Sequence, residues 1–549
     1  MAAPRLADAL RAQRDGREGD ARRLCQALLT QDPAQFDAWL LLAMLSSHAG
    51  DHEGALQALQ RAEALRPGDA ALQANRGNVL DAAGRPEAAL AAYDAALRQA
   101  PGFAAAHLNR AQLLQRLGRW AEAAAAFEGA AHEPAFADVL ADAGRAWLLA
   151  GRPESALVDF DHVLARRGPT PDAISNRAAA LRDLGRATEA LAAADAALSL
   201  QPQQVPALVN RGTALQDLGR LDEAVAAFEQ AAALQTDGAE ARWNLALALL
   251  QRGDLTRGFE LYETRFERGD LGVPRRHRQL QAWDGRAPLG GRRVLVHAEQ
   301  GLGDTLQFAR FVLLLAAQGA QVVLEVQRPL QRLLTSLDGV ARCIAMGADA
   351  GPVDAAVPLM SLPHRLGITL DRLPGATGYL RADPALVRAW RQRLGPTTRP
   401  RIGLQWRGGQ VSRIRGRQLP LQQLAPVLND RFDWVSLQKD LPDDDRSALA
   451  ALPQLRHFGA EQQDMADAAA LCSVVDAVVS VDTSIAHLAG ALARPTWVLL
   501  PAAADWRWLV QRVDSPWYAS LRLLRQTRDG DWSGPLAMLA TALETSFGR

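Results

Sequence analysis

The chain has 549 residues, with 61 Lys or Arg against 61 Asp or Glu, so its formal net charge is zero. A chain of this length exceeds what one hydrophobic core serves, so about two to four domains are expected. A neutral balance of charge disfavours a polyanion such as nucleic acid as the main partner.

Features of the whole chain predict a cytoplasmic location. Cys25, Cys343 and Cys472 are far apart and stand in apolar surroundings, which favours reduced thiols over a disulfide framework. The N-terminal segment, MAAPRLADALRAQRDG, is charged throughout and lacks the apolar centre of a signal peptide. No run approaches the ~18 apolar residues that a membrane span requires. We therefore expect a soluble cytoplasmic protein.

The first half of the chain is an internal repeat. Glycines recur at intervals of 34 residues, with one interval of 33, and a small residue follows each of them five positions later. The glycines are Gly16, Gly50, Gly84, Gly118, Gly151, Gly185, Gly219 and Gly253. This period resembles the tetratricopeptide repeat, in which two antiparallel helices meet at the glycine. It predicts an α-solenoid of about eight repeats over residues 1–267, with a concave surface that commonly binds a peptide or protein.

An amide recurs on the first helix of most repeats, nine residues before the turn glycine. These residues are Asn75, Asn109, Asn176, Asn210 and Asn244, with Asp142 in the same register. A carboxamide both donates and accepts, so such a ladder is suited to hold an extended acceptor peptide without reading its sequence. The array resembles that of eukaryotic O-GlcNAc transferase, whose repeats carry this ladder on their inner face. The alternative is that the amides are satisfied within the repeats and bind nothing.

After the repeats the pattern changes to strands that alternate with helices. Residues 268–290 lose the period and gain Pro, Gly and Arg, which predicts a linker. Apolar runs then predict strands near 293–298, 321–326, 401–406, 433–437, 476–481 and 496–500. Such alternation favours an α/β fold with parallel sheets. A break near residue 397 divides it into 291–397 and 398–549, two Rossmann-like halves in the arrangement known as GT-B.

The segment VLVHAEQGLGDTLQFAR, residues 294–310, predicts a strand, a tight loop and a helix. Gly301 and Gly303 allow the turn, and Asp304 stands at the start of the helix. Ligands of open α/β sheets lie at the carboxyl ends of strands, so Asp304 is a candidate general base that faces a cleft. The alternative is that Asp304 only caps the helix.

A second strand-to-helix segment predicts an anion site. After the apolar run that ends at residue 481, Asp482, Thr483 and Ser484 begin a helix and His487 follows one turn later. Free amides and the positive end of the helix dipole suit a diphosphate, and the hydroxyls and imidazole add hydrogen bonds. A helix cap with a packed histidine is the alternative.

Two further features add positive charge to this half. Arg407, Arg413, Arg415 and Arg417 fall within eleven residues after a predicted strand, and guanidinium groups bind phosphate oxygens bidentately. Lys439 is the only lysine among the 61 basic residues, which favours a role that arginine does not fill. A solvated arginine loop and a chance lysine are the alternatives.

At these motifs the second half resembles GT-B glycosyltransferases similar to the ADP-heptose:lipopolysaccharide heptosyltransferases. Their Gly-Asp catalytic pair corresponds to Gly303 and Asp304, and their Asp-Thr-Gly-x-x-His donor-phosphate motif corresponds to residues 482–487, with Ser484 in place of glycine. Their Lys-x-Trp-Pro motif corresponds most nearly to Arg417 in RQLP. With its repeats the whole chain resembles the bacterial tetratricopeptide glycosyltransferases, some of which modify flagellins.

The residues and the resemblance together imply an inverting glycosyltransferase that needs no metal or other cofactor. It would move a sugar from a nucleotide-sugar donor to a Ser or Thr hydroxyl of a protein held by the repeats, with flagellin as a candidate. Asp304 would be the base, and the donor would be bound by Gly301, Gly303, Arg417, Lys439, Asp482, Thr483, Ser484 and His487. Alternatives are a non-catalytic interaction scaffold with a degenerate GT-B half, and a transferase directed at a glycan or lipopolysaccharide.

Overall fold

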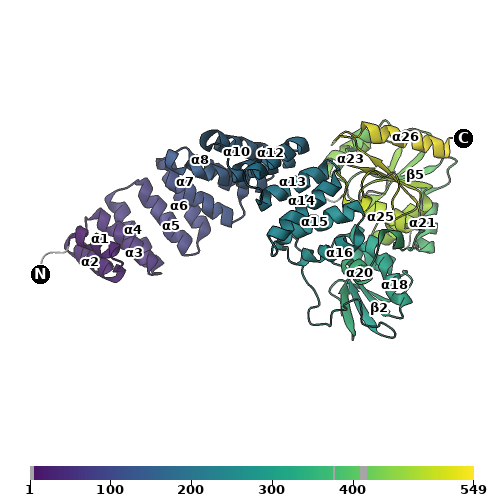
Figure 1. Ribbon diagram of the computed structural model, residues 1–549, viewed down its shortest axis with the longest axis horizontal. Helices are drawn as coiled ribbons and strands as arrows, with labels where there is room; N and C mark the ends of the chain where they lie inside the picture. Colours follow the sequence, from purple (N-terminus) through teal and green to yellow (C-terminus); the bar gives the residue numbers. More distant parts are fainter. Residues whose placement is uncertain (1–4, 375–376, 409–416, 529, 549) are drawn as a thin grey trace. The chain divides into compact units, whose positions relative to one another are not determined.

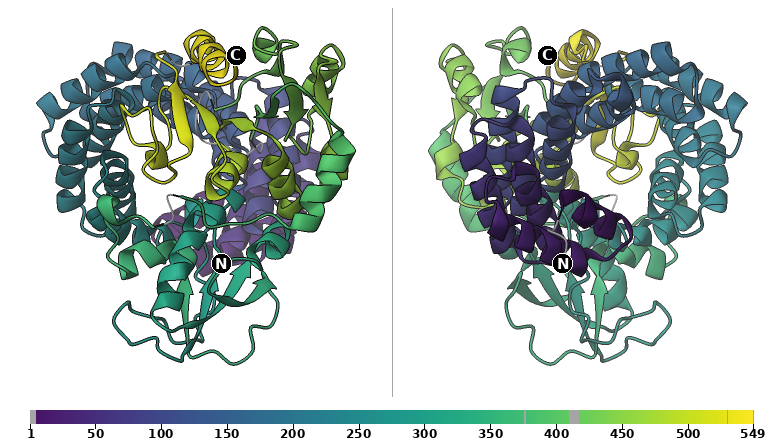
Figure 2. Two further views of the ribbon diagram at one scale, coloured as in Figure 1. Left: turned by 90° about the vertical axis from the view of Figure 1, so that its right-hand side faces the viewer. Right: turned by 90° about the vertical axis from the view of Figure 1, so that its left-hand side faces the viewer.

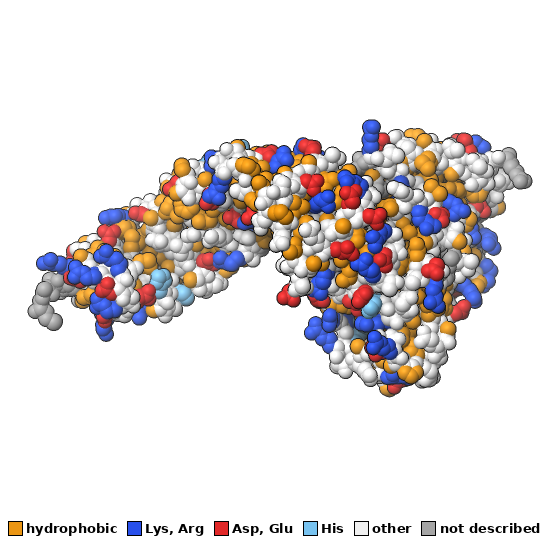
Figure 3. Space-filling view, in the orientation of Figure 1, with side chains coloured by type: hydrophobic (Ala, Val, Ile, Leu, Met, Phe, Trp, Pro, Cys, Tyr) orange, Lys and Arg blue, Asp and Glu red, His pale blue; other side chains and the backbone are white. Residues whose placement is uncertain are grey.

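The computed structural model describes residues 5–374, 377–408, 417–528 and 530–548 (Figure 1). The chain divides into two compact units, residues 1–210 and 211–549. The division falls inside the repeat array, so the last repeats belong to the same unit as the α/β part. The domain bounds expected from the sequence stay predictions. Acidic and basic side chains are interspersed on the face drawn in Figure 3.

The first unit consists of helices that follow one another in antiparallel pairs. They are α1 (Leu6–Arg14), α2 (Glu18–Gln31), α3 (Phe36–His48), α4 (His52–Leu65), α5 (Ala70–Ala82), α6 (Pro86–Gln99), α7 (Ala104–Arg116), α8 (Trp120–Ala131), η1 (Pro134–Val139), α9 (Leu140–Leu149), α10 (Pro153–Arg167), α11 (Pro171–Asp183), α12 (Ala187–Leu200) and the first part of α13 (Val205–Asp217). Figure 2 shows successive pairs of this unit stacked against one another. The predicted α-solenoid is confirmed here.

The turn glycines explain the period. Gly50 and Gly84 have φ of 79° and 70°, a left-handed conformation that other residues adopt only with strain. The small residues five positions later, such as Ala55 and Ala89, are fully buried where helices of a pair meet. A larger side chain would separate the helices, so glycine and alanine return together in each repeat.

The second unit begins with the last helices of the array and continues into two parallel sheets. The helices are α14 (Leu221–Leu234), α15 (Ala239–Arg252) and α16 (Leu255–Tyr262), followed by η2 (Glu263–Phe266) and η3 (Gly269–Leu271). The first sheet has the order β3-β2-β1-β4, from β1 (Arg293–His297), β2 (Gln321–Val326), β3 (Val340–Ala345) and β4 (Ala355–Pro358). The second has the order β10-β9-β8-β5-β6-β7, from β5 (Arg401–Gln405), β6 (Asp433–Ser436), β7 (Leu455–His457), β8 (Ala477–Val481), β9 (Thr496–Leu500) and β10 (Leu521–Arg525).

Helices connect the strands, as a parallel α/β fold requires. Those of the first sheet are α17 (Leu302–Phe308), η4 (Ala309–Phe311), α18 (Val312–Ala317), α19 (Arg328–Leu334), η5 (Leu359–Ser361), α20 (Leu362–Arg365) and η6 (Leu370–Arg372). Those of the second are α21 (Pro384–Leu394), α22 (Leu421–Leu424), α23 (Asp443–Ala450), η7 (Gly459–Glu461), α24 (Met465–Val474), α25 (Ser484–Ala491), η8 (Trp506–Trp508) and α26 (Ser533–Phe547). Among the described helices, none has the length and apolar character needed to cross a bilayer.

The strand order places both predicted motifs at topological switch points. In the first sheet, β1 has β2 on one side and β4 on the other, so the crevice opens at the loop that carries Asp304. In the second sheet, β5 lies between β6 and β8, and the loop after β8 carries the residues from Asp482 to His487. The helices after these strands, α17 and α25, pack against each other. The two crevices therefore face one another.

Two clusters fix the last repeat against the sheets. The ring centroid of Phe259 lies 5.8 Å from that of Phe308 on α17 and 5.7 Å from that of Trp506 on η8. Arg265, which is fully buried, pairs with Glu299 in the loop after β1, with 3.0 Å between Nη2 and Oε1. It also pairs with Glu263 at 2.5 Å. The end of the array thus forms part of the support for the first crevice.

Candidate functional site

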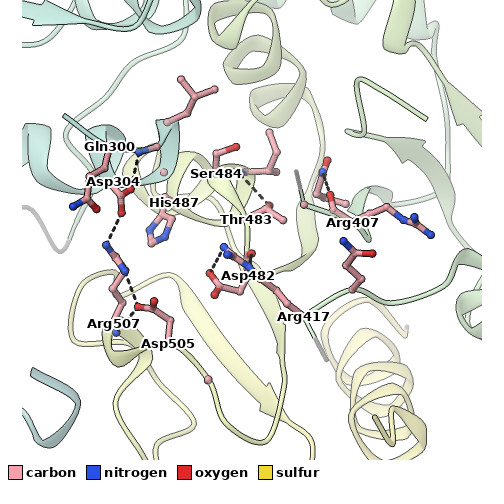
Figure 4. Close-up of a pocket in the computed structure, with 18 of the residues that line it drawn as sticks. Gln300, Asp304, Arg407, Arg417, Asp482, Thr483, Ser484, His487, Asp505 and Arg507 are labelled. Carbon is pink, nitrogen blue, oxygen red and sulfur yellow. Dashed lines mark hydrogen bonds and ion pairs between the residues drawn. The ribbon is translucent and has the colours of Figure 1, made fainter. Parts of the chain in front are cut away.

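A cavity of about 1530 Å³ opens between the two sheets of the second unit (Figure 4). Its wall comes from the loop after β1, the carboxyl ends of β5 and β6, the loop after β8, the segment before η8, and the last repeats. Gly301, Gly303, Asp304, Arg417, Lys439, Asp482, Thr483, Ser484 and His487 all line it. The structure therefore brings together the proposed base and the proposed donor residues, which the sequence spreads over nearly two hundred positions.

Gly303 in the first loop is needed for space and not for a left-handed turn. Neither Gly301 nor Gly303 has a positive φ, so the loop does not use the left-handed conformation that glycine allows. A Cβ at Gly303 would lie 3.1 Å from Cδ2 of His487 and 3.5 Å from Cα of Ser484. A side chain here would separate the β1 loop from the β8 loop, so glycine allows the two walls to meet.

Asp304 is both a cap and a member of the cavity wall. Its Oδ2 accepts from the backbone N–H of Gly301 at 2.9 Å, as in the capping alternative. Its Oδ1 lies 2.5 Å from Nη2 of Arg507, the contact drawn as a dashed line in Figure 4. The carboxylate is thus held in place from two sides while its side chain remains partly exposed to the cavity.

Arg507 is a site residue that the sequence did not reveal. Nη1 pairs with Oδ1 of Asp505 at 2.7 Å, and Nε donates to Oε1 of Gln307 at 2.8 Å. Burial lowers the pKa of this guanidinium, but the carboxylates of Asp505 and Asp304 more than compensate and hold the pKa above its usual value. A local signal does exist, because Arg507 stands between two tryptophans after β9, the strand next to β8.

The β8 loop combines a helix cap with cavity-facing groups. The hydroxyl of Thr483 accepts from the backbone N–H of Ile485 at 3.2 Å, so this residue caps α25 as the capping alternative predicts. Ser484, the first residue of α25, lines the cavity beside it. Asp482 is buried, and burial raises its pKa while the nearby Arg417 opposes the shift. One of its oxygens, Oδ2, has no hydrogen-bond partner among the described residues.

His487 is buried as a neutral ring. Its Nδ1 lies 3.1 Å from the hydroxyl of Tyr518, and its ring stacks on Trp508 with 5.3 Å between centroids. Burial, followed by the charges of Arg507 and Arg417, lowers its pKa well below the usual value. When the tyrosine hydroxyl donates to Nδ1, the proton of the ring is on Nε2, which becomes a donor. His487 therefore suits a hydrogen bond to an anion and not an ion pair.

The other described cations of the wall are also partnered. Arg417 donates to the carbonyl oxygen of Asp482, and its Nη2 lies 3.3 Å from Oδ1 of the same residue (Figure 4). Arg407 pairs with the buried carboxylate of Asp445 at 3.0 Å. Lys439 is exposed and donates to the carbonyl of Gln463 at 2.8 Å. The remaining two arginines of the predicted cluster, Arg413 and Arg415, lie outside the described residues.

The five ladder amides have different surroundings, and none of them lines the cavity. Asn210 is buried and donates to the carbonyl of Ser175 at 2.9 Å, and Asn109 donates to Asn78 at 2.8 Å. Asn75 is exposed, whereas Asn176 and Asn244 are half-buried. Two of the amides thus join neighbouring repeats, as in the structural alternative, and peptide binding by the ladder stays a prediction.

Asn210→Ala is expected to destabilise the chain by about 1–3 kcal/mol, because it leaves the buried carbonyl of Ser175 without this donor. Asn75→Ala, in the same register but exposed, is the matched control and should change stability by less than about 0.5 kcal/mol. Urea unfolding of the intact chain followed by circular dichroism measures both. Equal effects would mean that the Asn210 bond contributes nothing.

No group of three or more His, Cys, Asp or Glu side chains within the described ranges is placed to hold a metal ion. Metal independence stays a prediction. It rests on the cations that line the cavity, which can stabilise a diphosphate in place of a metal ion.

Comparisons with known proteins identify the class of the first half. Tetratricopeptide-repeat family models match residues 12–78, 75–138 and 209–265. The repeats predicted from the glycine period are therefore present, and such repeats are scaffolds for protein interaction. No membership that covers the whole chain follows from these matches.

A curated relative extends further. Protein FlbA of Caulobacter vibrioides is 30% identical over 327 residues, which cover 53% of this chain and 52% of FlbA. The chain thus spans about half the length of the curated relative it matches. Among solved structures, the C-terminal part of a tetratricopeptide-repeat protein from Cytophaga hutchinsonii is 14% identical over 44% of this chain and 99% of its own, with a TM-score of 0.36. The MamA protein is 20% identical over 29% of this chain and 86% of its own, with a TM-score of 0.26.

Proposed function

We propose that the chain is an inverting glycosyltransferase of the GT-B type, which moves a sugar from a nucleotide-sugar donor to a Ser or Thr hydroxyl of a protein. One observation carries the proposal. The switch-point loops of two parallel sheets face the same cavity, with the carboxylate of Asp304 on one wall and the amino-terminal end of α25 on the other. A base opposite an anion site is the arrangement that group transfer from a diphosphate requires.

In the proposed reaction the donor diphosphate binds at the start of α25. Backbone amides near Ser484, the neutral imidazole of His487 and the side chains of Arg417 and Lys439 hold its oxygens. The acceptor hydroxyl attacks the anomeric carbon from the opposite face, and Asp304 takes its proton. The bond between the anomeric carbon and the phosphate oxygen breaks, and the nucleoside diphosphate leaves with the electron pair.

Arg507 is proposed as a positioning residue for this base. It contacts Asp304, Asp505 and Gln307 together, which leaves the carboxylate only a narrow range of orientations. Its guanidinium lies 4.4 Å from the centroid of the Trp506 ring, which restricts it further. This support fixes a reactive group to within the small tolerance that transfer chemistry allows.

The acceptor is proposed to be a protein because the repeats are present. Flagellin is a candidate through the resemblance of the chain to the bacterial tetratricopeptide glycosyltransferases. Mass spectrometry of the host's proteins, with and without the chain, tests the proposal by the gain of a sugar mass on Ser or Thr peptides. A scaffold would be recovered with partners that gain no mass, and a glycan-directed enzyme would change glycans alone.

His487→Ala and Lys439→Ala are both expected to weaken binding of a nucleoside diphosphate. The neutral imidazole should contribute about 0.5–1.5 kcal/mol, and the charged ammonium about 1.5–3 kcal/mol, because charge-assisted hydrogen bonds are stronger. Isothermal titration calorimetry with UDP, ADP and GDP measures the loss. His364→Ala on α20 and Arg391→Ala on α21, which change the same residue type or charge away from the cavity, are the controls. Unchanged affinity in both site variants would mean that the diphosphate binds elsewhere.

A further inference from the structure

The cavity is larger than one substrate needs. Pockets for small ligands and cofactors commonly measure about 300–1,000 Å³. The volume of about 1530 Å³ therefore leaves room for a second substrate beside a nucleotide sugar. The second substrate should lie at the end of the cavity away from the cations Arg407, Arg417 and Lys439.

The last repeats form another part of the cavity wall. Five side chains contribute, and we call them the repeat wall. They are Gln216 on α13, Trp243, Leu247 and Gln251 on α15, and Tyr262 at the end of α16. All belong to the same compact unit as the two sheets. None of the five carries a charge at neutral pH. Tyr262 is the one that can ionise, and burial raises its pKa to about 12.

The repeat wall is continuous with the reacting groups. The rings of Trp243 and Tyr262 lie 4.8 Å apart between centroids, and the Tyr262 hydroxyl lies 3.3 Å from Oε1 of Gln300. Gln300 is in the same loop as Asp304. Tyr262 also contacts Trp506 edge to face, with 6.4 Å between centroids, next to Arg507. A ligand on the repeat wall would therefore end beside the Asp304 carboxylate.

Two carboxamides give the repeat wall its polar groups. Nε2 of Gln216 donates to Oε1 of Gln251 at 2.6 Å. This bond uses one donor and one acceptor, so the pair retains the other oxygen and the other amide hydrogens. Those groups are the complement of a peptide bond, which offers one N–H and one C=O. Beside them, Trp243 and Leu247 offer apolar surface to a side chain.

We propose that the repeat wall is the acceptor subsite and that it takes an extended, uncharged polypeptide segment with an aromatic or aliphatic residue next to the modified Ser or Thr. The proposal rests on the proposed function and names its acceptor more closely. The five side chains carry no charge, and the nearby Arg507 is already paired with Asp304 and Asp505, which argues against a phosphorylated or acidic glycan because it would lose water without gaining a free cation. A Phe beside the acceptor hydroxyl gains apolar contact there, whereas a Glu is desolvated without a partner.

Peptide binding to the full-length Asp304→Asn protein tests the proposal, because that variant is expected to hold substrates without turning them over. The probes are two fluorescein-labelled peptides, identical stretches of Ala, Gly and one Ser, with either Phe or Glu next to the Ser. Fluorescence anisotropy in the presence of UDP measures their affinities. We expect the Phe peptide to bind at least about tenfold more tightly.

Two variants made in the same protein connect the preference to the repeat wall. Trp243→Ala should reduce the preference to less than about twofold, whereas Trp39→Ala on α3, also a half-buried repeat tryptophan, should leave it unchanged. Gln216→Glu keeps the shape of the side chain but removes the donor to Oε1 of Gln251, and its carboxylate can instead accept from Nε2 of Gln251 once that amide turns over. It should make a third peptide, with Lys next to the Ser, bind about tenfold more tightly than it binds to the parent.

The outcomes separate this proposal from the proposed function. No binding of any peptide up to about 1 mM, or a preference unaffected by both Trp243→Ala and Gln216→Glu, would overturn the acceptor subsite. Binding of neutral maltohexaose in place of the peptides would overturn it as well, in favour of a glycan acceptor. If the peptides bind as expected but the unsubstituted chain transfers no sugar to host proteins, the subsite stands and the enzyme proposal fails.

Discussion

Replacing Asp304 by Asn is expected to lower the rate of sugar transfer by about 10²–10⁴-fold, the usual contribution of a general base. The amide keeps the shape of the side chain and can still accept from the backbone N–H of Gly301, so the start of α17 should be preserved. Arg507 keeps its other partners, Asp505 and Gln307. Affinity for the nucleotide donor should therefore remain near that of the parent, and the loss should appear in kcat.

A second capping aspartate provides the control for this result. Asp383 accepts from the backbone N–H of Ala385 at 2.7 Å and caps α21, and it does not line the cavity. Asp383→Asn should leave turnover within about twofold of the parent, because it removes a cap without touching a reacting group. If the two variants lose activity equally, Asp304 acts only as a cap. If donor affinity falls together with turnover, Asp304 binds the donor and is not the base.

The sequence predicted the strands that are buried on both faces and missed the others. β1, β5 and β8 are mostly apolar, almost all of their residues are buried, and each strand lies inside a sheet. β10 has two arginines among its leucines, one of them exposed, and β3 has mostly exposed or half-buried residues. These two are edge strands, for which one neighbour is absent and burial no longer selects an apolar run. β4 and β7, of four and three residues, are the other two edge strands, so a short run adds to the missing neighbour.

The site was predictable where a local motif exists. Asp304, Thr483, Ser484 and His487 stand in strand-to-helix loops, and the strand order brings those loops to one cavity. Arg507 was not predictable in this way, because it is one of 60 arginines and its partner Asp304 lies 203 positions away. The neutral state of His487 was also beyond the sequence. It results from burial, which no neighbour in the chain reveals.

The largest expected effect on stability is that of Arg265→Met, about 3–5 kcal/mol. Arg265 is fully buried and lies between Glu299 and Glu263, so methionine would fill its volume but leave two carboxylates without their cation. Burial already raises the pKa of Glu299 while Arg265 opposes the shift. Loss of the guanidinium should raise that pKa further, so Glu299 will be ionised in the unfolded chain at neutral pH but will resist ionisation in the folded one.

The sign of the pH dependence follows from proton binding. A carboxyl whose pKa is raised by folding binds more protons in the folded state, so its cost disappears as the pH falls. The deficit of Arg265→Met should therefore be smaller at pH 5 than at pH 7.5, by about 1 kcal/mol or more. Urea unfolding followed by tryptophan fluorescence measures it, since ten of the 13 tryptophans follow residue 210 and report on the second unit.

Arg393→Met is the control. It breaks an exposed pair with Glu461, made by two hydrogen bonds of 2.8 Å, and should cost only about 0–1 kcal/mol at either pH. A deficit for Arg265→Met as small as that of Arg393→Met, or one that grows as the pH falls, would show that the buried cation does not hold the β1 loop against the last repeat.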